Sequence, residues 1–351
     1  MTHLWVRAEQ RDNETRVGLT PEGAAALMVA GIDVTVERSP SRVIADEAYA
    51  QAGCTMAQSH TWPDAPQETI IFGLKELQEE DSPLIHRHIM FGHAFKGQPA
   101  GLRLLRRFRK GGGTLLDLEY LTDAQGRRLA AFGYWAGYAG AAVALKCWAA
   151  QQTGQLAAAL GAYETSAHLL SDLRVDLEAT ETDRPNALII GAQGRVGSGV
   201  ADLCAEMGVA TTKWDLAETA SGGPFPEVLT HDLFFNCVLA RPGTPVFVPV
   251  EAIKQPRKLS VIADIACDPD SDFSPIKVYD QTTSWETPAL RVHEHPVLDV
   301  TAIDNLPSLL PLESSKDYAE QLLPVLKSLA DPDAPVWTRA RATFDEHIAK
   351  L

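Results

Sequence analysis

Lys75 and His93 are residue types that can move protons, and they occupy equivalent places in the sequence. Lys75 follows the apolar run TIIFGL (69–74), and His93 follows HIMFG (88–92). Neighbouring positive charges ease deprotonation of a lysine, and imidazole exchanges protons near neutral pH. If the fold brings the two side chains together, the pair could perform general acid–base catalysis.

Charged residues also follow the other apolar runs of the first half. The first run leads into Arg11, Glu14 and Arg16, and TLLDL (114–118) leads into Glu119 and the pair Arg127–Arg128; Glu76 and Lys96 follow the catalytic candidates. Because arginine clamps carboxylates with two parallel hydrogen bonds, this set favours an amino-acid or keto-acid substrate with several carboxylates. Whether a C–N or a C–O bond would react does not follow from these residues.

A glycine-rich stretch, NALIIGAQGRVGSG (186–199), places Gly191, Gly194 and Gly197 after a predicted strand and at the start of a predicted helix. Such glycines let the backbone approach a pyrophosphate, which the helix N-terminus also attracts. Asp215 follows the next predicted strand and could accept a hydrogen bond from a ribose 2′-hydroxyl. The stretch therefore predicts a dinucleotide site that prefers NAD to NADP, and a structural glycine turn is the alternative.

Alternating strands and helices must position these residues. The pattern predicts an α/β fold with two Rossmann-like, doubly wound parallel-sheet domains and an active-site cleft between them. We expect strands at 3–8, 32–37, 69–74, 88–92, 114–118, 186–192, 209–214, 233–239 and 259–266, and helices at 20–31, 101–113 and about 195–207.

The predicted substrate domain comprises residues 1–134 plus about 318–351, where two helical tail segments dock, and the NAD-binding domain comprises 135–317. The Ala- and Gly-rich segment 134–150 is interrupted by Lys146 and is too short for a membrane span, so we expect a buried interdomain helix. The polar stretch 153–185 predicts a connector. His293 and His295 are expected in a surface loop, without a metal.

Composition narrows the class of protein. The 351 residues carry 31 basic and 46 acidic side chains, and a net charge of −15 argues against nucleic-acid and anionic-membrane partners. The five cysteines are scattered without a CxxC pair, which predicts free thiols and no metal site. The first residues lack the pattern of a signal peptide, so we expect a cytoplasmic protein.

Several stretches, in the same order along the chain, resemble the NAD-dependent, L-lysine-forming saccharopine dehydrogenases, relatives of alanine dehydrogenase and transhydrogenase. The resemblance covers nearly the whole chain and is weakest at 153–185 and 241–300. Its most specific stretches are DLEYL, GRRLAAFG and GAQGRVGSG, and it includes ETRVGLTPEG, GLKEL, FGHAFK, KWDL, SGGPF, DNLPSLLP and PVWTRARATFDEH.

The resemblance implies a reversible reaction in which saccharopine, NAD and water give L-lysine, 2-oxoglutarate and NADH. It implies that Lys75 and His93 are the acid–base pair and that Arg16 and Arg128 bind the 2-oxoglutarate carboxylates. It further implies roles for Glu76 and Glu119 in tuning the pocket, for Lys96 and Gln98 as substrate contacts, for Gly191, Gly194, Arg195, Val196, Gly197 and Asp215 in binding NAD, and for Asp304 near cofactor or substrate. We expect a monomer or a weak homo-oligomer.

One departure from the family concerns Val196. Fungal members carry a cysteine there that can pair with the position of Cys237, so this chain cannot form that disulfide. The alternative function is an alanine dehydrogenase-like or opine-type enzyme with another amine donor. An inactive binding protein of the same fold is the alternative from another class.

Overall fold

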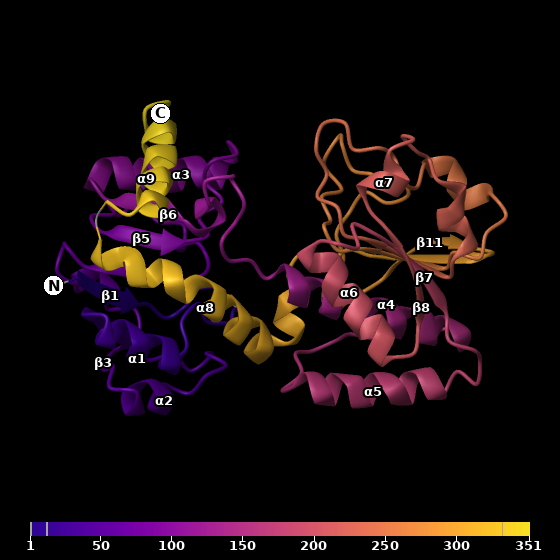
Figure 1. Ribbon diagram of the computed structural model, residues 1–351, viewed down its shortest axis with the longest axis horizontal. Helices are drawn as coiled ribbons and strands as arrows, with labels where there is room; N and C mark the ends of the chain where they lie inside the picture. The colour runs from indigo at the N-terminus through magenta and orange to yellow at the C-terminus, as the bar shows by residue number, and fades with distance from the viewer. Residues whose placement is uncertain (1, 12, 332) are drawn as a thin grey trace. The chain divides into compact units, whose positions relative to one another are not determined.

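The computed structural model describes residues 2–11, 13–331 and 333–351, and the chain forms two compact units (Figure 1). Unit 1 comprises Met1–Ala131 and Pro311–Leu351, and unit 2 comprises Phe132–Leu310. Each unit contains one six-stranded sheet with helices around it. The α/β class predicted from the sequence is therefore confirmed.

The sheet of unit 1 is entirely parallel in its described strands. Its order is β3-β2-β1-β4-β5-β6. The chain winds outward from β1 in one direction and from β4 in the other, so the order reverses between these two neighbours. Ligands of open α/β sheets bind at the carboxyl ends of the strands beside such a reversal. The strands are β1 (Thr2–Val6), β2 (Ile32–Glu37), β3 (Thr55–Ala57), β4 (Ile70–Phe72), β5 (Arg87–Met90) and β6 (Thr114–Asp117).

The two helices predicted in the first half of the chain are present in unit 1, with bounds that differ by one or two residues, and α2 was not predicted. At the start of the first helix Thr20 accepts the N–H of Gly23 (3.2 Å), and Gly112 follows the third helix in a left-handed conformation with φ of 78°. The helices are α1 (Pro21–Val29), α2 (Asp46–Gln51), α3 (Pro99–Gly111), α8 (Pro311–Lys327) and α9 (Pro335–Ile348), with short 3₁₀ turns η1 (Trp62–Asp64), η2 (Leu118–Tyr120) and η6 (Ser328–Ala330).

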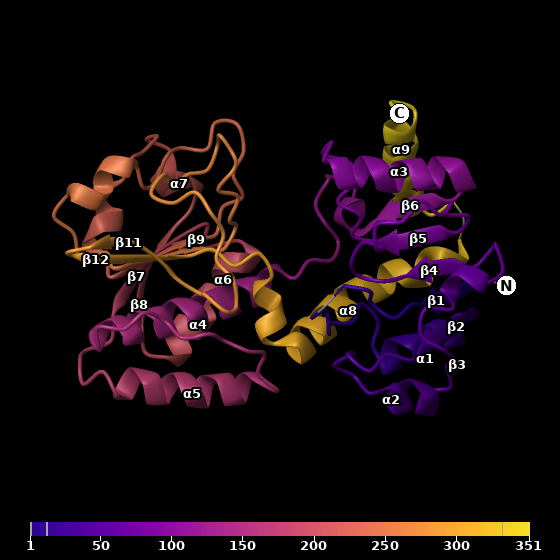
Figure 2. The same cartoon turned by 180° about the vertical axis from the view of Figure 1, so that it is seen from behind.

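The C-terminal helices α8 and α9 belong to unit 1 although residues 132–310 separate them from the rest of it in sequence. The hydroxyl of Ser315 accepts the N–H of Val17 at 2.9 Å, and the Gln321 side chain exchanges two hydrogen bonds with the backbone of Ala131. In both views α9 lies beside α3 (Figure 2). Side-chain-to-backbone bonds thus fix the tail to the unit that carries Lys75 and His93.

The sheet of unit 2 has the order β11-β12-β10-β9-β7-β8, in which only β11 runs antiparallel among the described strands. Along β7, Ala187 and Ile189 pack into one apolar cluster and Leu188 and Ile190 into another, so both faces of the sheet are buried. Burial on both faces explains the uninterrupted apolar run. The strands are β7 (Asn186–Ile190), β8 (Ala210–Trp214), β9 (Leu233–Asn236), β10 (Val261–Asp264), β11 (Leu290–Glu294) and β12 (Val297–Thr301).

The hairpin of β11 and β12 was not predicted, and it corrects the expectation for His293. His293 lies in β11 rather than in a loop, and its Nδ1 is 2.8 Å from the carbonyl oxygen of Pro296. Among the described residues, no group of three or more His, Cys, Asp or Glu side chains is arranged to hold a metal ion.

The Ala- and Gly-rich helix lies in unit 2, and most of its residues are buried, as expected. An added Cβ would lie 1.9 Å from the Val196 carbonyl oxygen at Gly137, and 2.0 Å from that of Tyr134 at Gly199. The small residues therefore serve close packing between two helices. No described helix is both long and apolar enough for a membrane span. The helices are α4 (Gly133–Gln152), α5 (Ser166–Glu178), α6 (Arg195–Glu206) and α7 (Leu216–Thr219), with 3₁₀ turns η3 (Pro226–Thr230), η4 (Val250–Lys254) and η5 (Leu306–Leu309).

Helix α5 corrects the prediction of a connector at 153–185. Leu169, Leu173 and Leu177 recur every fourth residue and are buried in the core of unit 2. The ammonium of Lys146, which interrupts the apolar run of α4, lies 2.8 Å from a carboxylate oxygen of Asp172 on α5. An apolar stripe and an ion pair thus join α5 to α4.

We expect Leu173→Ala to lower the free energy of unfolding by about 2–5 kcal/mol, because the side chain is fully buried and its removal leaves a cavity. Denaturant unfolding of the purified protein measures this loss. Val175→Ala on the same helix is the control, since Val175 is 63% exposed, and its effect should stay within about 0.5 kcal/mol. Equal effects of the two substitutions would contradict the packing of α5.

Candidate active site

The reversal of strand order in unit 1 brings Lys75 next to the residues that follow β1. The Glu9 carboxylate accepts the N–H groups of Leu74 (2.6 Å) and Lys75 (3.1 Å). The fully buried Arg7 donates to the carbonyl oxygen of Lys75 and lies 3.3 Å from Glu9. An added Cβ at Gly73 would lie 2.5 Å from the Arg7 guanidinium, so a glycine is needed here. The backbone of Lys75 is therefore fixed by residues of the neighbouring strand.

The surroundings of Lys75 favour its neutral form. Burial lowers the pKa of Lys75 the most, and the positive charge of Arg16 lowers it further. Arg16 is buried in a two-point ion pair with Glu14, at 2.8 and 2.6 Å. Although burial opposes ionisation of Glu14, the hydrogen bonds and charge of Arg16 lower its pKa, so this pair is ionised. A lowered pKa makes a lysine better suited to proton exchange.

His93 lies at the carboxyl end of the next strand, β5, and shares a carboxylate with Arg11. Its Nδ1 is 3.3 Å from Glu76 Oε2, and Arg11 Nη1 is 3.3 Å from Glu76 Oε1. Burial favours the neutral form of Glu76, but the adjacent His93 ring and the positive charge of Arg11 lower its pKa to about 2. Glu76 is thus a carboxylate, directly after Lys75, that orients the exposed imidazole.

The backbone at His93 has a conformation that non-glycine residues rarely adopt. Its φ is 47°, in the left-handed region, which costs of the order of 1 kcal/mol for a residue with a Cβ. Helix α3 packs closely under this turn, since an added Cβ at Gly101 would lie 2.8 Å from the His93 carbonyl oxygen. The fold therefore imposes the turn that presents the imidazole.

A second group of charged side chains follows β5 and β6. Lys96 Nζ is 3.3 Å from Glu119 Oε1, and Arg128 donates to the same oxygen. Two cations around one carboxylate leave a positive charge that could attract an anionic substrate. Arg127, by contrast, pairs with Asp123 at 2.8 Å, and its side chain is 78% exposed. Of the two adjacent arginines, Arg128 is the one in this group.

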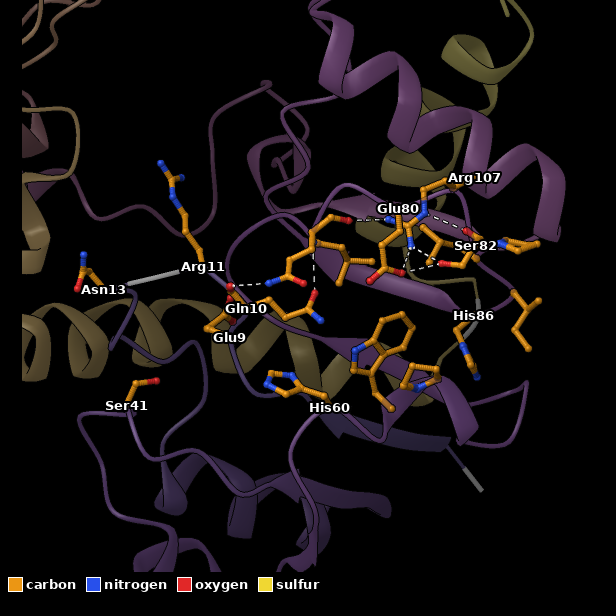
Figure 3. A pocket seen from close by; sticks show the side chains of 17 residues that line it. Glu9, Gln10, Arg11, Asn13, Ser41, His60, Glu80, Ser82, His86 and Arg107 are labelled. Carbon is orange, nitrogen blue, oxygen red and sulfur yellow. Dashed lines mark hydrogen bonds and ion pairs between the residues drawn. The ribbon is translucent and has the colours of Figure 1, made fainter.

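Two cavities adjoin the loops that follow β1 and β4. Glu76, His93 and Gln98 line a cavity of about 580 Å³, so the structure brings these three predicted residues together. A second cavity, of about 750 Å³, is lined by Glu9, Gln10 and Arg11 on one side and by His86 and Arg107 among others (Figure 3). Both cavities lie within unit 1.

In unit 2 the glycine-rich loop has the backbone that the dinucleotide prediction requires. Gly191 has a φ of 88°, and an added Cβ at Gly197 would lie 2.3 Å from the Gly191 carbonyl oxygen. Gly194 is the N-cap of α6 and offers no side chain to the helix, whose first turn begins with Arg195 and Val196. First-turn N–H groups have no acceptor inside a helix, so this end can bind a phosphate. The loop fits a dinucleotide.

Asp215 follows the strand next to β7 and lies beside the glycine-rich loop. Asp304 follows a strand that does not neighbour β7. Asp215 follows β8, and its carboxylate accepts the N–H groups of Gln193 (3.0 Å) and Leu216 (2.9 Å). Each carboxylate oxygen has two lone pairs, so a ribose hydroxyl could still bind. The exposed Asp304 follows β12, and β10 and β9 separate that strand from β7.

Several polar residues that are buried or partly buried near the strand ends were not singled out from the sequence. Arg7 and Glu9 hold Lys75, and Asp117 ends β6 with 1% exposure. In unit 2, Asp264 accepts hydrogen bonds from Asn236 (2.8 Å) and Tyr279 (2.7 Å) at the ends of β9 and β10. The sequence could have indicated them, because a polar residue stands at or just after the end of an apolar strand in each case.

All five cysteines are free, as predicted. Burial raises the pKa of Cys237 far above its usual range, so this thiol stays protonated.

Comparison with known proteins gives a consistent set of relatives. The family described as alanine dehydrogenase/PNT, N-terminal domain, matches residues 5–139. A protein of Neurospora crassa named saccharopine dehydrogenase (NAD(+), L-lysine-forming) is 43% identical, with 100% of this chain and 97% of the relative covered. A protein of the same name from Yarrowia lipolytica is 42% identical, with 99% and 98% covered.

Solved structures agree on the fold. An L-alanine dehydrogenase has a TM-score of 0.69 at 20% identity, covering 99% of this chain and 94% of its own. A transhydrogenase from Sinorhizobium meliloti has a TM-score of 0.57 at 17% identity, covering 94% of each chain. At these identities the likeness establishes a shared fold.

Proposed function

The chain belongs to the family of NAD(+)-dependent, L-lysine-forming saccharopine dehydrogenases, and we propose that it interconverts saccharopine with L-lysine and 2-oxoglutarate. Saccharopine, NAD⁺ and water give L-lysine, 2-oxoglutarate, NADH and a proton. The observation that carries the proposal is the full-length identity of more than 40% to proteins of that name, in a chain whose Lys75 and His93 follow adjacent strands.

The glycine-rich loop with Asp215 would hold NAD⁺, which would supply the hydride acceptor. The amine-bearing carbon of the glutaryl portion loses a hydride, and the secondary amine becomes an imine. Water adds to that imine, and the C–N bond of the resulting carbinolamine breaks to release L-lysine. In each of these steps a nitrogen or oxygen atom of the substrate or water must gain or lose a proton.

Lys75 and His93 are suited to these proton transfers. With its lowered pKa, Lys75 can accept the proton of the secondary amine as the hydride leaves. His93, held by Glu76 at 3.3 Å, can take a proton from the attacking water and return it to the leaving nitrogen. The two residues would therefore serve different steps of one reaction.

The carboxylates of the substrate would be bound by Arg16 and Arg128, with Lys96 and Gln98 as further contacts. Arg16 is held rigidly by Glu14, and Arg128 and Lys96 share Glu119. The fixed carboxylates Glu76 and Glu119 would face the amine and balance these cations. Saccharopine has three carboxylates, whereas pyruvate has one, so this many cations favours the larger substrate. Asp304 remains a proposed contact of the cofactor or substrate.

We expect Arg128→Gln to raise the KM for 2-oxoglutarate about tenfold or more, because a charge-assisted hydrogen bond to a carboxylate is lost. Steady-state kinetics at saturating NADH and L-lysine measure this. Arg127→Gln is the matched control, since its side chain is 78% exposed and pairs with Asp123, and its KM should stay within about twofold. The same KM for both variants as for the wild type would remove Arg128 from the substrate site.

The reaction itself is tested by following NADH oxidation with two substrate pairs. L-lysine with 2-oxoglutarate should support turnover and yield a product with the mass of saccharopine. Pyruvate with ammonia, the pair expected of an alanine dehydrogenase, should support little. The reverse preference would establish the alternative amine donor, and no turnover with either pair would favour the inactive binding protein.

A further inference from the structure

Asp117 is a buried carboxylate that hydrogen-bonds to two backbone segments of unit 1. One segment leads into His93, and the other contains Glu119. It is the last residue of β6 and is 1% exposed. Its Oδ1 accepts the N–H of Glu119 at 2.9 Å, and its Oδ2 accepts the N–H of Gly92 at 3.1 Å. Both oxygens are therefore used, each by a backbone amide of a different segment.

These two amides belong to the segments that present the proposed catalytic and substrate-binding side chains. Gly92 directly precedes His93, and Glu119 is the carboxylate shared by Lys96 and Arg128. The strands β5 and β6 are paired in parallel with Met90 opposite Asp117, so their carboxyl ends are adjacent.

We propose that Asp117 is a positioning residue for the reaction, which sets the placement of His93 relative to Glu119 through these two backbone amides. It is not a catalytic residue, because it is buried and both oxygens bind protein amides. The proposal rests on the proposed function, since it takes His93 and Glu119 as parts of the site.

A carboxylate is the side chain that this task requires. Its two oxygens can each accept a hydrogen bond, whereas an asparagine accepts with one oxygen and would direct N–H groups at the other amide. An asparagine would therefore lose the hydrogen bond from the backbone N–H of either Gly92 or Glu119. His93 has a left-handed φ of 47°, so its turn depends on such surrounding bonds.

The charge of Asp117 does not serve stability at neutral pH. Burial raises its pKa to about 6, even though the two amides favour the carboxylate. A carboxyl with a raised pKa stabilises the fold below its unfolded pKa, and that contribution is lost as the pH rises through about 6. The ionisable groups that interact with it are His93 after β5, Glu119 and Tyr120 in η2, and Tyr318 in α8.

The test compares Asp117→Asn with Asp299→Asn in the full-length enzyme. Asp299 is an equally buried carboxylate in unit 2, paired with Arg291 at 2.8 Å, and it has no part in the proposed site. We expect Asp117→Asn to lower kcat with L-lysine and 2-oxoglutarate by about 10- to 100-fold, because small misplacements of reacting groups are costly. Its Tm and its Kd for NADH should stay close to those of the wild type. Asp299→Asn should lower Tm and leave kcat within about twofold.

A wild-type kcat per folded molecule of Asp117→Asn overturns the proposal. If Asp117→Asn does not fold, Asp117→Glu keeps the charge, displaces it by one methylene, and should show the same loss of kcat. Failure of both variants to fold would assign Asp117 to folding and overturn the proposal.

Hydrogen exchange separates this inference from the proposed function. If the wild type converts neither substrate pair, the proposed function fails. Peptides that contain Gly92 and Glu119 should still exchange faster in Asp117→Asn than in Asp299→Asn. Equal exchange in the two variants would overturn the positioning role whatever the reaction.

Discussion

Lys75→Met should lower kcat by about 100-fold or more, because methionine fills the space of the lysine stem but cannot exchange a proton. Lys75 is the residue whose backbone Arg7 and Glu9 hold and whose pKa burial and Arg16 lower. Steady-state rates of NADH oxidation with L-lysine and 2-oxoglutarate measure the loss. The Kd for NADH, from fluorescence titration, should change little, since the dinucleotide loop is in unit 2.

Lys110→Met is the matched control for this prediction. Lys110 is exposed in the last turn of α3, and its loss removes the same charge and the same number of methylenes from unit 1. Its kcat should equal that of the wild type. Turnover in Lys75→Met that matches the control would exclude Lys75 from proton transfer, even if the enzyme makes saccharopine.

Gly194→Ala should weaken NADH binding by about 30-fold or more, because the added methyl occupies the side of the loop that a pyrophosphate must approach. The folded chain has room for this methyl, since it would lie 3.5 Å from the Gly191 carbonyl oxygen, an ordinary van der Waals contact. Tm should therefore be unchanged while the Kd for NADH rises. Fluorescence titration and thermal unfolding of the same preparation measure both quantities.

Gly161→Ala provides the control in the same unit. An added Cβ at Gly161 meets no atom of the described chain within 4 Å, so neither Tm nor Kd should change. Gly197→Ala is less informative, because its methyl would lie 2.3 Å from a carbonyl oxygen of the loop itself. An unchanged Kd in Gly194→Ala would mean that the glycines serve only a turn.

The residues after the strands could be predicted because parallel strands bring their carboxyl ends to one edge of a sheet. That rule alone identified Lys75, His93 and Glu119, which the structure places after β4, β5 and β6. It missed Arg7 and Glu9 because their importance depends on the pairing of β1 with β4, which local sequence does not determine. Asp117 was missed because it was treated as part of an apolar strand.

The elements that escaped prediction are short or amphipathic. Strand β3 has only three residues, and the β11–β12 hairpin lies in the stretch where the family resemblance is weakest. Helix α5 was hidden by its polar surface, although Leu169, Leu173 and Leu177 mark one buried face. Propensity and composition alone underestimate a helix whose stability comes from tertiary packing.

The central claim is that Lys75 and His93 of unit 1 move the protons of the reaction at the bridging nitrogen of saccharopine. A crystal structure with NADH and saccharopine bound would test it most directly. We predict that Lys75 Nζ and the His93 ring each approach the substrate's bridging nitrogen to about 2.6–3.2 Å, or through a single water. Side chains that point away from the ligand, with that nitrogen surrounded by other residues, would contradict it.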